Sequence, residues 1–178
     1  EYITWVDEVG EYVPEPVLVF SPLYFYPPLD IFSIPKQCPD VVIKEVYVSF
    51  ALFFADPPAS ANSVRKVIEK ILDEEGITRS TKNGGFLKLD GKPGEASRIN
   101  FFEQKLTASN QETKIIEYFR AIKFIGNDGS HDSDITKQDI LDAYEILETI
   151  FDEMYVGHRK SVEKKVSLIN ERKKPLHP

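Results

Sequence analysis

The sequence predicts a mainly α-helical protein: a bundle of about five helices that follows an extended arm rich in proline and aromatic residues. Nine of the twelve prolines precede residue 59, and proline at this density forbids long helices. Further along the chain, apolar residues recur at the spacing of three and four that places them on one face of a helix. We therefore expect an arm over residues 1–39 packed on the bundle, a helical bundle over residues 40–156, and a basic C-terminal helix or tail over residues 157–178.

The composition limits the class of protein. Of the 178 residues, 42% are hydrophobic and 29% are charged, which is ordinary for one soluble domain with a core. Twenty-two basic against twenty-nine acidic residues leave a net charge of -7, which argues against a generally basic surface that coats nucleic acid. No apolar run approaches the ~20 residues that cross a bilayer, so no membrane partner is expected. Cys38 is the only cysteine, which excludes an internal disulfide and a cysteine-based zinc site. A reducing, cytoplasmic location fits best, and neither a metal nor a cofactor is predicted.

The arm is predicted to be extended or turn-rich, because its prolines interrupt any regular helix. Residues 17–20 read Val-Leu-Val-Phe, and we expect a short strand there. The aromatic residues of the arm are expected to pack onto the bundle, so the arm is not an independent domain.

The first two helices are predicted on either side of a proline pair. Residues 41–55 are apolar on nearly every side, which suits a buried helix or a buried strand, and their length favours the helix. Asp56, Pro57 and Pro58 break this element, and Ser60 is predicted to cap the next one. An amphipathic helix then runs to Gly76, a residue type that commonly follows a last helical turn.

Three more helices are predicted after a polar segment. Residues 77–97 are rich in glycine, lysine, serine and threonine, and are predicted to form a flexible loop. A glycine-rich phosphate cradle is the alternative, but the spacing matches no P-loop or dinucleotide fingerprint. Two helices follow, the second ending at Gly126, and the fifth begins near Thr136, where Thr136 and Asp139 form a pair typical of a capping box.

The C-terminal residues differ from the rest in charge. From Gly157 onward the chain holds seven Lys or Arg against two Glu, a local charge of +5, while residues 1–156 carry -12. Such a segment is most often a solvated helix or a frayed end. A basic tail can also hold an acidic partner surface.

One short polar motif carries a functional signal. Between two predicted helices the chain reads Gly126-Asn-Asp-Gly-Ser-His131. Gly126 and Gly129 permit a tight turn that aims Asn127 and His131 to the same side. The amino terminus of the following helix favours a nearby anion.

This motif, with the helix over residues 61–69 upstream, resembles the domain-of-unknown-function 4145 family and, beyond it, the HEPN-like helical superfamily. The resemblance covers residues 35–155 and implies a helical bundle from bacterial or phage-defence-type proteins. It also implies a metal-independent ribonuclease chemistry, in which an arginine, a polar residue and a histidine face their counterparts across a dimer. Carried onto this chain, Asn127 takes the polar position, His131 takes the histidine position, and Gly126 stands where the arginine belongs.

The missing arginine changes the expected chemistry. Removing one charge-stabilising donor from an active site costs about a hundredfold to a thousandfold in rate. Lys123 and Arg120 lie one and two turns before Gly126, so either could substitute, although lysine lacks the planar guanidinium fork. Asp128, Asp132 and Asp134 add local negative charge, which repels an RNA backbone unless these carboxylates bind a metal or pair with the lysine and arginine. The alternative for His131 is a structural role that ties the turn together.

These observations leave three functions open. The first is a non-catalytic helical assembly module that forms a homodimer or belongs to a larger host protein. The second is a HEPN-type endoribonuclease that uses His131 and Asn127 with Lys123 or Arg120. The third is nucleotide binding without cleavage at the turn 126–131. Local acidity disfavours RNA and nucleotide, so whether the chain is an enzyme is left open. Arg65 and Glu69, four residues apart, are interpreted as an ion pair.

Overall fold

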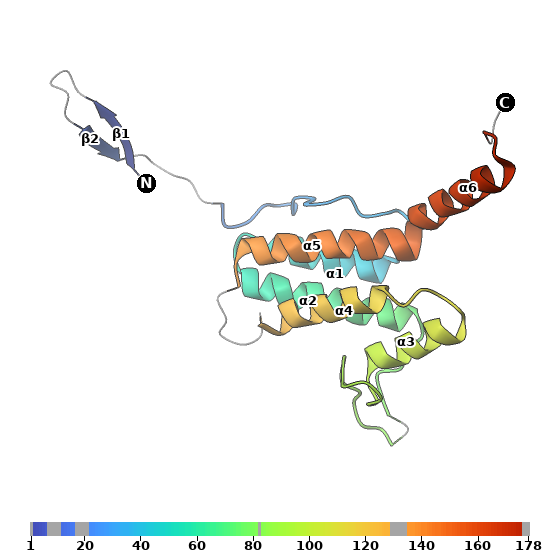
Figure 1. The fold of residues 1–178 in the computed structure, drawn as a ribbon. Coiled ribbons are helices and arrows are strands. Elements are labelled where there is room, and N and C mark those ends of the chain that lie inside the picture. Colours follow the sequence, from blue (N-terminus) through green and yellow to red (C-terminus); the bar gives the residue numbers. More distant parts are fainter. Residues whose placement is uncertain (1, 7–11, 17–21, 82, 129–134, 176–178) are drawn as a thin grey trace.

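The computed structural model describes residues 2–6, 12–16, 22–81, 83–128 and 135–175. Within these ranges the chain is mainly α-helical, which confirms the predicted fold class (Figure 1). The elements, in chain order, are β1 (Tyr2–Val6), β2 (Tyr12–Pro16), α1 (Asp40–Leu52), α2 (Pro57–Glu74), α3 (Arg98–Ala108), α4 (Ile115–Asp128), α5 (Lys137–Phe151), the π-helical turn η1 (Asp152–Val156) and α6 (His158–Arg172).

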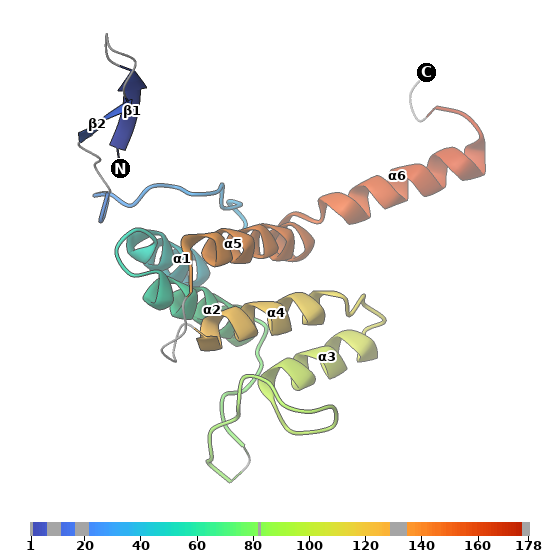
Figure 2. The ribbon, with the colours of Figure 1, turned by 60° about the vertical axis from the view of Figure 1, so that its left-hand side comes forward.

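Helix α2 is the centre of the bundle. It packs against α1, α4 and α5, and α3 covers the outer side of α4 (Figures 1 and 2). Its apolar residues fall at helical spacing and are fully buried, as at Val64, Ile68 and Ile71. The core therefore lies around α2, and α4 is held at a fixed position on it.

The Asp56–Pro58 segment separates α1 from α2, as predicted, and it also begins α2. The side chain of Asp56 accepts a hydrogen bond from the Ala59 backbone N–H at 2.9 Å, and Pro57 and Pro58 occupy the first turn, where a missing N–H costs nothing. The predicted cap at Ser60 is wrong, because Ser60 lies inside the helix and is buried.

Ser60 instead joins a buried group of three hydroxyls that links α1, α2 and α5. The Ser49 and Ser60 oxygens lie 3.0 Å apart, and the Tyr144 hydroxyl lies 2.8 Å from Ser49 and 3.2 Å from Ser60. Each buried hydroxyl thus has a partner, as a core without water requires.

Residues 77–97 are tied to the bundle by backbone hydrogen bonds. The Ile77 N–H donates to the Leu72 carbonyl of α2 at 2.8 Å, and the Arg98 N–H of α3 donates to the Lys88 carbonyl at 3.0 Å. The Arg98 side chain is 3% exposed, and its Nη2 lies 2.7 Å from Asp73 Oδ1 and 3.2 Å from the Ile77 carbonyl oxygen. This segment crosses the surface beside α3 and α4 with defined contacts at both ends.

The N-terminal region contains an antiparallel hairpin, β1–β2, in which Thr4 pairs with Pro14. The strand expected over residues 17–20 lies outside the described residues. Residues 22–39 run over α1 and α5 without regular structure, and the Phe32 ring lies 5.1 Å from Phe50 and 5.6 Å from Tyr144 (Figure 1). This segment therefore adds aromatic side chains to the edge of the core.

Helix α5 begins as predicted and leads into the C-terminal helix. The Thr136 hydroxyl accepts from the Asp139 N–H at 3.3 Å and the Asp139 carboxylate accepts from the Thr136 N–H at 2.8 Å, which completes the capping box. After η1, Gly157 has a φ of +66°, and α6 continues away from the bundle in both views (Figures 1 and 2). No helix within the described ranges has the length and apolar character needed to cross a bilayer.

Candidate functional site at the crossing of α2 and α4

Helix α4 carries three of the four predicted site residues. Arg120, Lys123 and Asn127 are spaced by three and four, so they share one face of α4. His131 lies outside the described residues. The predicted end of the helix at Gly126 is wrong: α4 continues to Asp128, and Gly126 is buried within it. The first residues of the turn expected over Gly126–His131 are therefore helical, as far as Asp128.

Arg120 and Lys123 both face Asp90, which comes from the segment before α3. Arg120 Nε lies 3.6 Å from Asp90 Oδ1, and Lys123 Nζ lies 3.9 Å from Asp90 Oδ2. Arg120 Nη2 also lies 2.9 Å from the Glu103 carboxylate and donates to the Asn100 side-chain oxygen at 3.0 Å. The Asp90 side chain is 9% exposed, so low solvent screening strengthens its attraction for the two cations. Both of the predicted replacements for the missing arginine thus already have carboxylate partners.

Gly126 allows α2 and α4 to approach closely. A Cβ atom built on Gly126 would overlap the Cβ of Arg65 and would come within 3.0 Å of the Ala61 carbonyl oxygen. The distance to the Arg65 Cβ would be shorter than real Cβ contacts, so any larger residue at position 126 would push the two helices apart. The glycine at the arginine position of the motif therefore has a packing reason.

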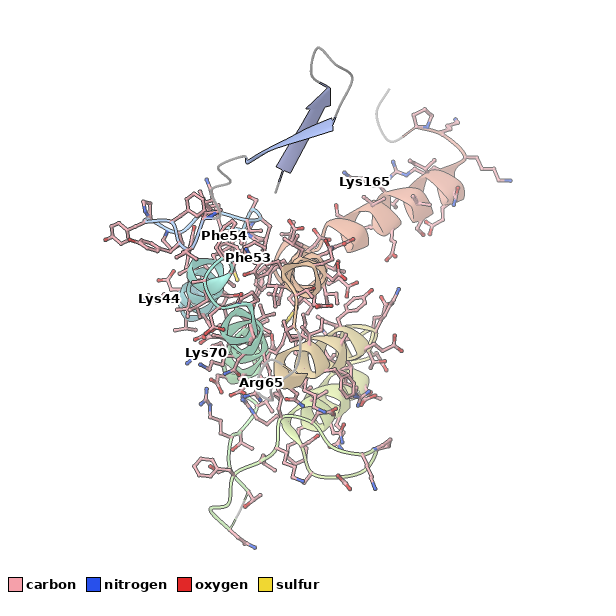
Figure 3. The ribbon with its side chains drawn as sticks, turned by 90° about the vertical axis from the view of Figure 1, so that its left-hand side faces the viewer. Lys44, Phe53, Phe54, Arg65, Lys70 and Lys165 are labelled. Carbon is pink, nitrogen blue, oxygen red and sulfur yellow. The ribbon has the colours of Figure 1, made fainter. Side chains whose placement is uncertain are left out.

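Arg65 lies directly over Gly126, on the side of α2 that faces α4 (Figure 3). Its Nη1 is 3.2 Å from Glu69 Oε1, which confirms the ion pair expected from their spacing, and its side chain is 26% exposed. Within the described residues, Arg65 Nε and Asn62 Oδ1 are buried without a hydrogen-bond partner. The base of the Arg65 side chain thus packs against Gly126, across the crossing of α2 and α4.

Sequence reasoning missed the contact between Arg65 and Gly126. The one signal in the chain is a glycine inside an apolar helical pattern, a position that costs ~1 kcal/mol relative to alanine and so indicates a close approach of backbone. Nothing in the sequence identifies Arg65 as the residue on the other side.

The arrangement defines what this surface can bind. A partly exposed guanidinium can donate to an anion, but Glu69 competes for it at 3.2 Å. Asn127 is half-buried one residue after Gly126, and its amide is a further donor on the face of α4 that carries Arg120 and Lys123. Among the described residues, no group of three or more His, Cys, Asp or Glu side chains is arranged to hold a metal ion.

The fold and this site define a helical-bundle module in which polar side chains lie around the crossing of α2 and α4. The family described as Domain of unknown function (DUF4145) matches residues 48–172, which is more than half of the chain. The chain belongs to this family. No curated protein and no solved structure gives a significant match.

Proposed function

We propose that this chain is a non-catalytic helical assembly module that self-associates, alone or within a larger bacterial or phage-defence-type protein of the cytoplasm. The observation that carries the non-catalytic part is the pairing of Arg120 and Lys123 with Asp90 and Glu103. A phosphate would have to displace these carboxylates before it met either cation. Close packing at Gly126 supports the same conclusion, because position 126 of α4 has no room for the side chain of an arginine.

Self-association is supported by an apolar row that α6 leaves exposed. Val162, Val166 and Ile169 are each two-fifths to one-half exposed on a helix that projects from the bundle (Figure 2). A row of this kind is typical of a surface that packs against a partner.

Light scattering during size exclusion, combined with incubation of the same preparation with labelled single-stranded RNA, tests this function. We expect a dimer at micromolar concentration and intact RNA. Cleavage of the RNA that is abolished by His131→Ala, with helicity unchanged by circular dichroism, would contradict the non-catalytic proposal. A monomer at all concentrations would contradict self-association.

The second candidate is a metal-independent HEPN-type endoribonuclease, or a nucleotide-binding module, built on Gly126–His131. The specific observation that favours it is Arg65, because the base of this arginine side chain, on α2, packs against Gly126 at the motif position that lacks an arginine. An arginine from a neighbouring helix could stabilise charge on a phosphate in place of one within the motif.

Arg65→Ala and His131→Ala test this second candidate together. If the chain cleaves RNA, both substitutions should lower the rate about a hundredfold or more, while Lys66→Ala, an exposed neighbour on α2, should leave it unchanged. For nucleotide binding without cleavage, the thermal stabilisation by added nucleotide should disappear in Asn127→Ala.

A further inference from the structure

Helix α6 has an apolar face that no described part of the chain covers. Val162, Val166 and Ile169 are 41%, 50% and 41% exposed, and their spacing of four and three places them on one side of the helix. Both views show α6 beyond the end of the bundle (Figures 1 and 2). We name these three residues the α6 face.

Cations border the α6 face. Lys165 and Arg172 are seven residues apart, two helical turns, and lie along one edge of the apolar row. Residues 157–178 carry +5, against -12 on residues 1–156. The α6 face is therefore suited to a surface that combines apolar contact with negative charge.

The same chain has such a surface between α4 and α5. Two adjoining hollows meet at Tyr118 and Thr149, and the larger is about 580 Å³. Carboxylates of α5 and η1 line them, with Tyr118 and Ile146 as apolar lining: Asp142, Glu145, Glu148, Asp152 and Glu153. We name this surface the acidic groove. No lysine or arginine of the described ranges forms an ion pair with Glu145, Glu148 or Asp152.

We propose that the α6 face of one copy of this chain docks in the acidic groove of a second copy. Val162, Val166 and Ile169 pack on the apolar lining, and Lys165 and Arg172 approach the carboxylates of α5. This inference rests on the proposed self-association and names the two surfaces that produce it. If the exchange is reciprocal, one two-fold axis gives two such contacts and a closed dimer.

The direction of α6 favours a second copy over the chain's own groove. The groove ends at Val156, immediately before Gly157, so α6 of the same chain would have to reverse direction there to cover it. Gly157 instead has a φ of +66° and α6 runs outward (Figure 1). Charge also favours a second copy over RNA or an anionic membrane, because the -12 carried by residues 1–156 repels a polyanion that approaches α6.

Charge reversal on the full chain tests the proposal. Lys165→Glu/Arg172→Glu should raise the dimer dissociation constant about tenfold or more, and Glu145→Lys/Glu148→Lys should do the same. Combining all four substitutions in one chain should restore most of the affinity, since the charges are exchanged. Lys44→Glu/Lys70→Glu, which makes the same change of charge on α1 and α2, is the matched control and should leave the dimer intact (Figure 3).

A cysteine pair distinguishes docking of α6 on a second copy from folding of α6 onto the acidic groove of its own chain. In Ile146→Cys/Val166→Cys, oxidation should give a covalent dimer, because each new thiol meets its partner in the other copy. A disulfide within one chain would overturn the proposal in favour of α6 folding back on its own groove.

The outcomes distinguish this inference from the function on which it rests. A dimer that tolerates both charge reversals and Val166→Asp would overturn the docking of α6 while leaving self-association intact. A wild-type monomer at every concentration would overturn both.

Discussion

Gly126 of α4 packs so closely against Arg65 of α2 that no side chain larger than hydrogen fits at position 126. A Cβ on Gly126 would overlap Arg65 Cβ and lie 3.1 Å from Arg65 Cγ. The atoms in the way are backbone and the rigid base of a side chain, which cannot move aside as a side-chain tip can. The helix crossing, and with it the place of Asn127, therefore depends on this glycine.

Gly126→Ala should destabilise the fold by about 1–3 kcal/mol, although alanine is the better helix former by ~1 kcal/mol. The overlap with Arg65 outweighs the gain in helix propensity. Urea unfolding followed by circular dichroism measures the change. Arg65→Gly removes the overlapping atom, so the double variant should lose less than the sum of the two single variants. A Gly126→Ala protein as stable as the wild type would show that the helices are not in close contact.

The sequence was sufficient for the helices because each buries one face at regular spacing. The apolar rows of α2 and α5 predicted those elements, and the Thr136 and Asp139 pair located the start of α5. The end of α4 was missed because glycine is a poor helix former in isolation, and the gain that keeps it helical comes from packing on Arg65 of α2, 61 residues away in the chain.

The candidate site was less predictable because its contacts also join segments that are distant in the chain. Arg120 and Lys123 were identified from their helical spacing to the motif, but their partner Asp90 comes from a segment read as a flexible loop. Local spacing along one helix says nothing about a carboxylate that a separate segment brings to it. His131 stays a prediction, because it lies outside the described residues.

Cys38 should make the fold sensitive to alkaline pH. Its side chain is 4% exposed, and burial raises the pKa of the thiol from 9.0 to about 12. The folded state therefore keeps a proton that the unfolded state loses above pH 9, so stability is complete below pH 9 and falls as the pH rises toward 12. The expected slope is about 1.4 kcal/mol per pH unit. Urea unfolding at pH 7 to 10 measures it.

Cys38→Ala is the control for this slope. Burial also raises the pKa of Tyr144 and Tyr155 above 10, so these phenols contribute only at higher pH. Between pH 9 and 10 the Cys38→Ala protein should lose less stability than the wild type. If it loses stability there as steeply as the wild type, another group is responsible.

Arg98 should be essential for the attachment of the 77–97 segment to α2. Its guanidinium lies 2.7 Å from Asp73 Oδ1 and 3.3 Å from the Glu69 carbonyl oxygen, in a nearly fully buried position. Arg98→Ala leaves buried acceptors without a donor and should cost about 2–3 kcal/mol in free energy of unfolding. Arg79→Ala, which removes an exposed guanidinium from the same Asp73, should cost less than about 1 kcal/mol. Equal losses in the two variants would assign the stability to Asp73 instead.

Asp90→Asn should weaken the ion pairs of Asp90 with Arg120 and Lys123 while keeping a side chain of nearly the same size at position 90. The amide carries no charge, so the attraction that holds residues 88–92 against α4 is weakened, and backbone hydrogen exchange in that range should become faster. The two cations are then available to a polyanion, so fluorescence anisotropy at low salt should detect tighter binding of labelled single-stranded RNA than in the wild type. Glu74→Gln removes one negative charge from an exposed position on α2 and should change neither measurement. If Glu74→Gln strengthens RNA binding as much as Asp90→Asn does, the effect comes from net charge, and the carboxylate of Asp90 does not shield the α4 cations.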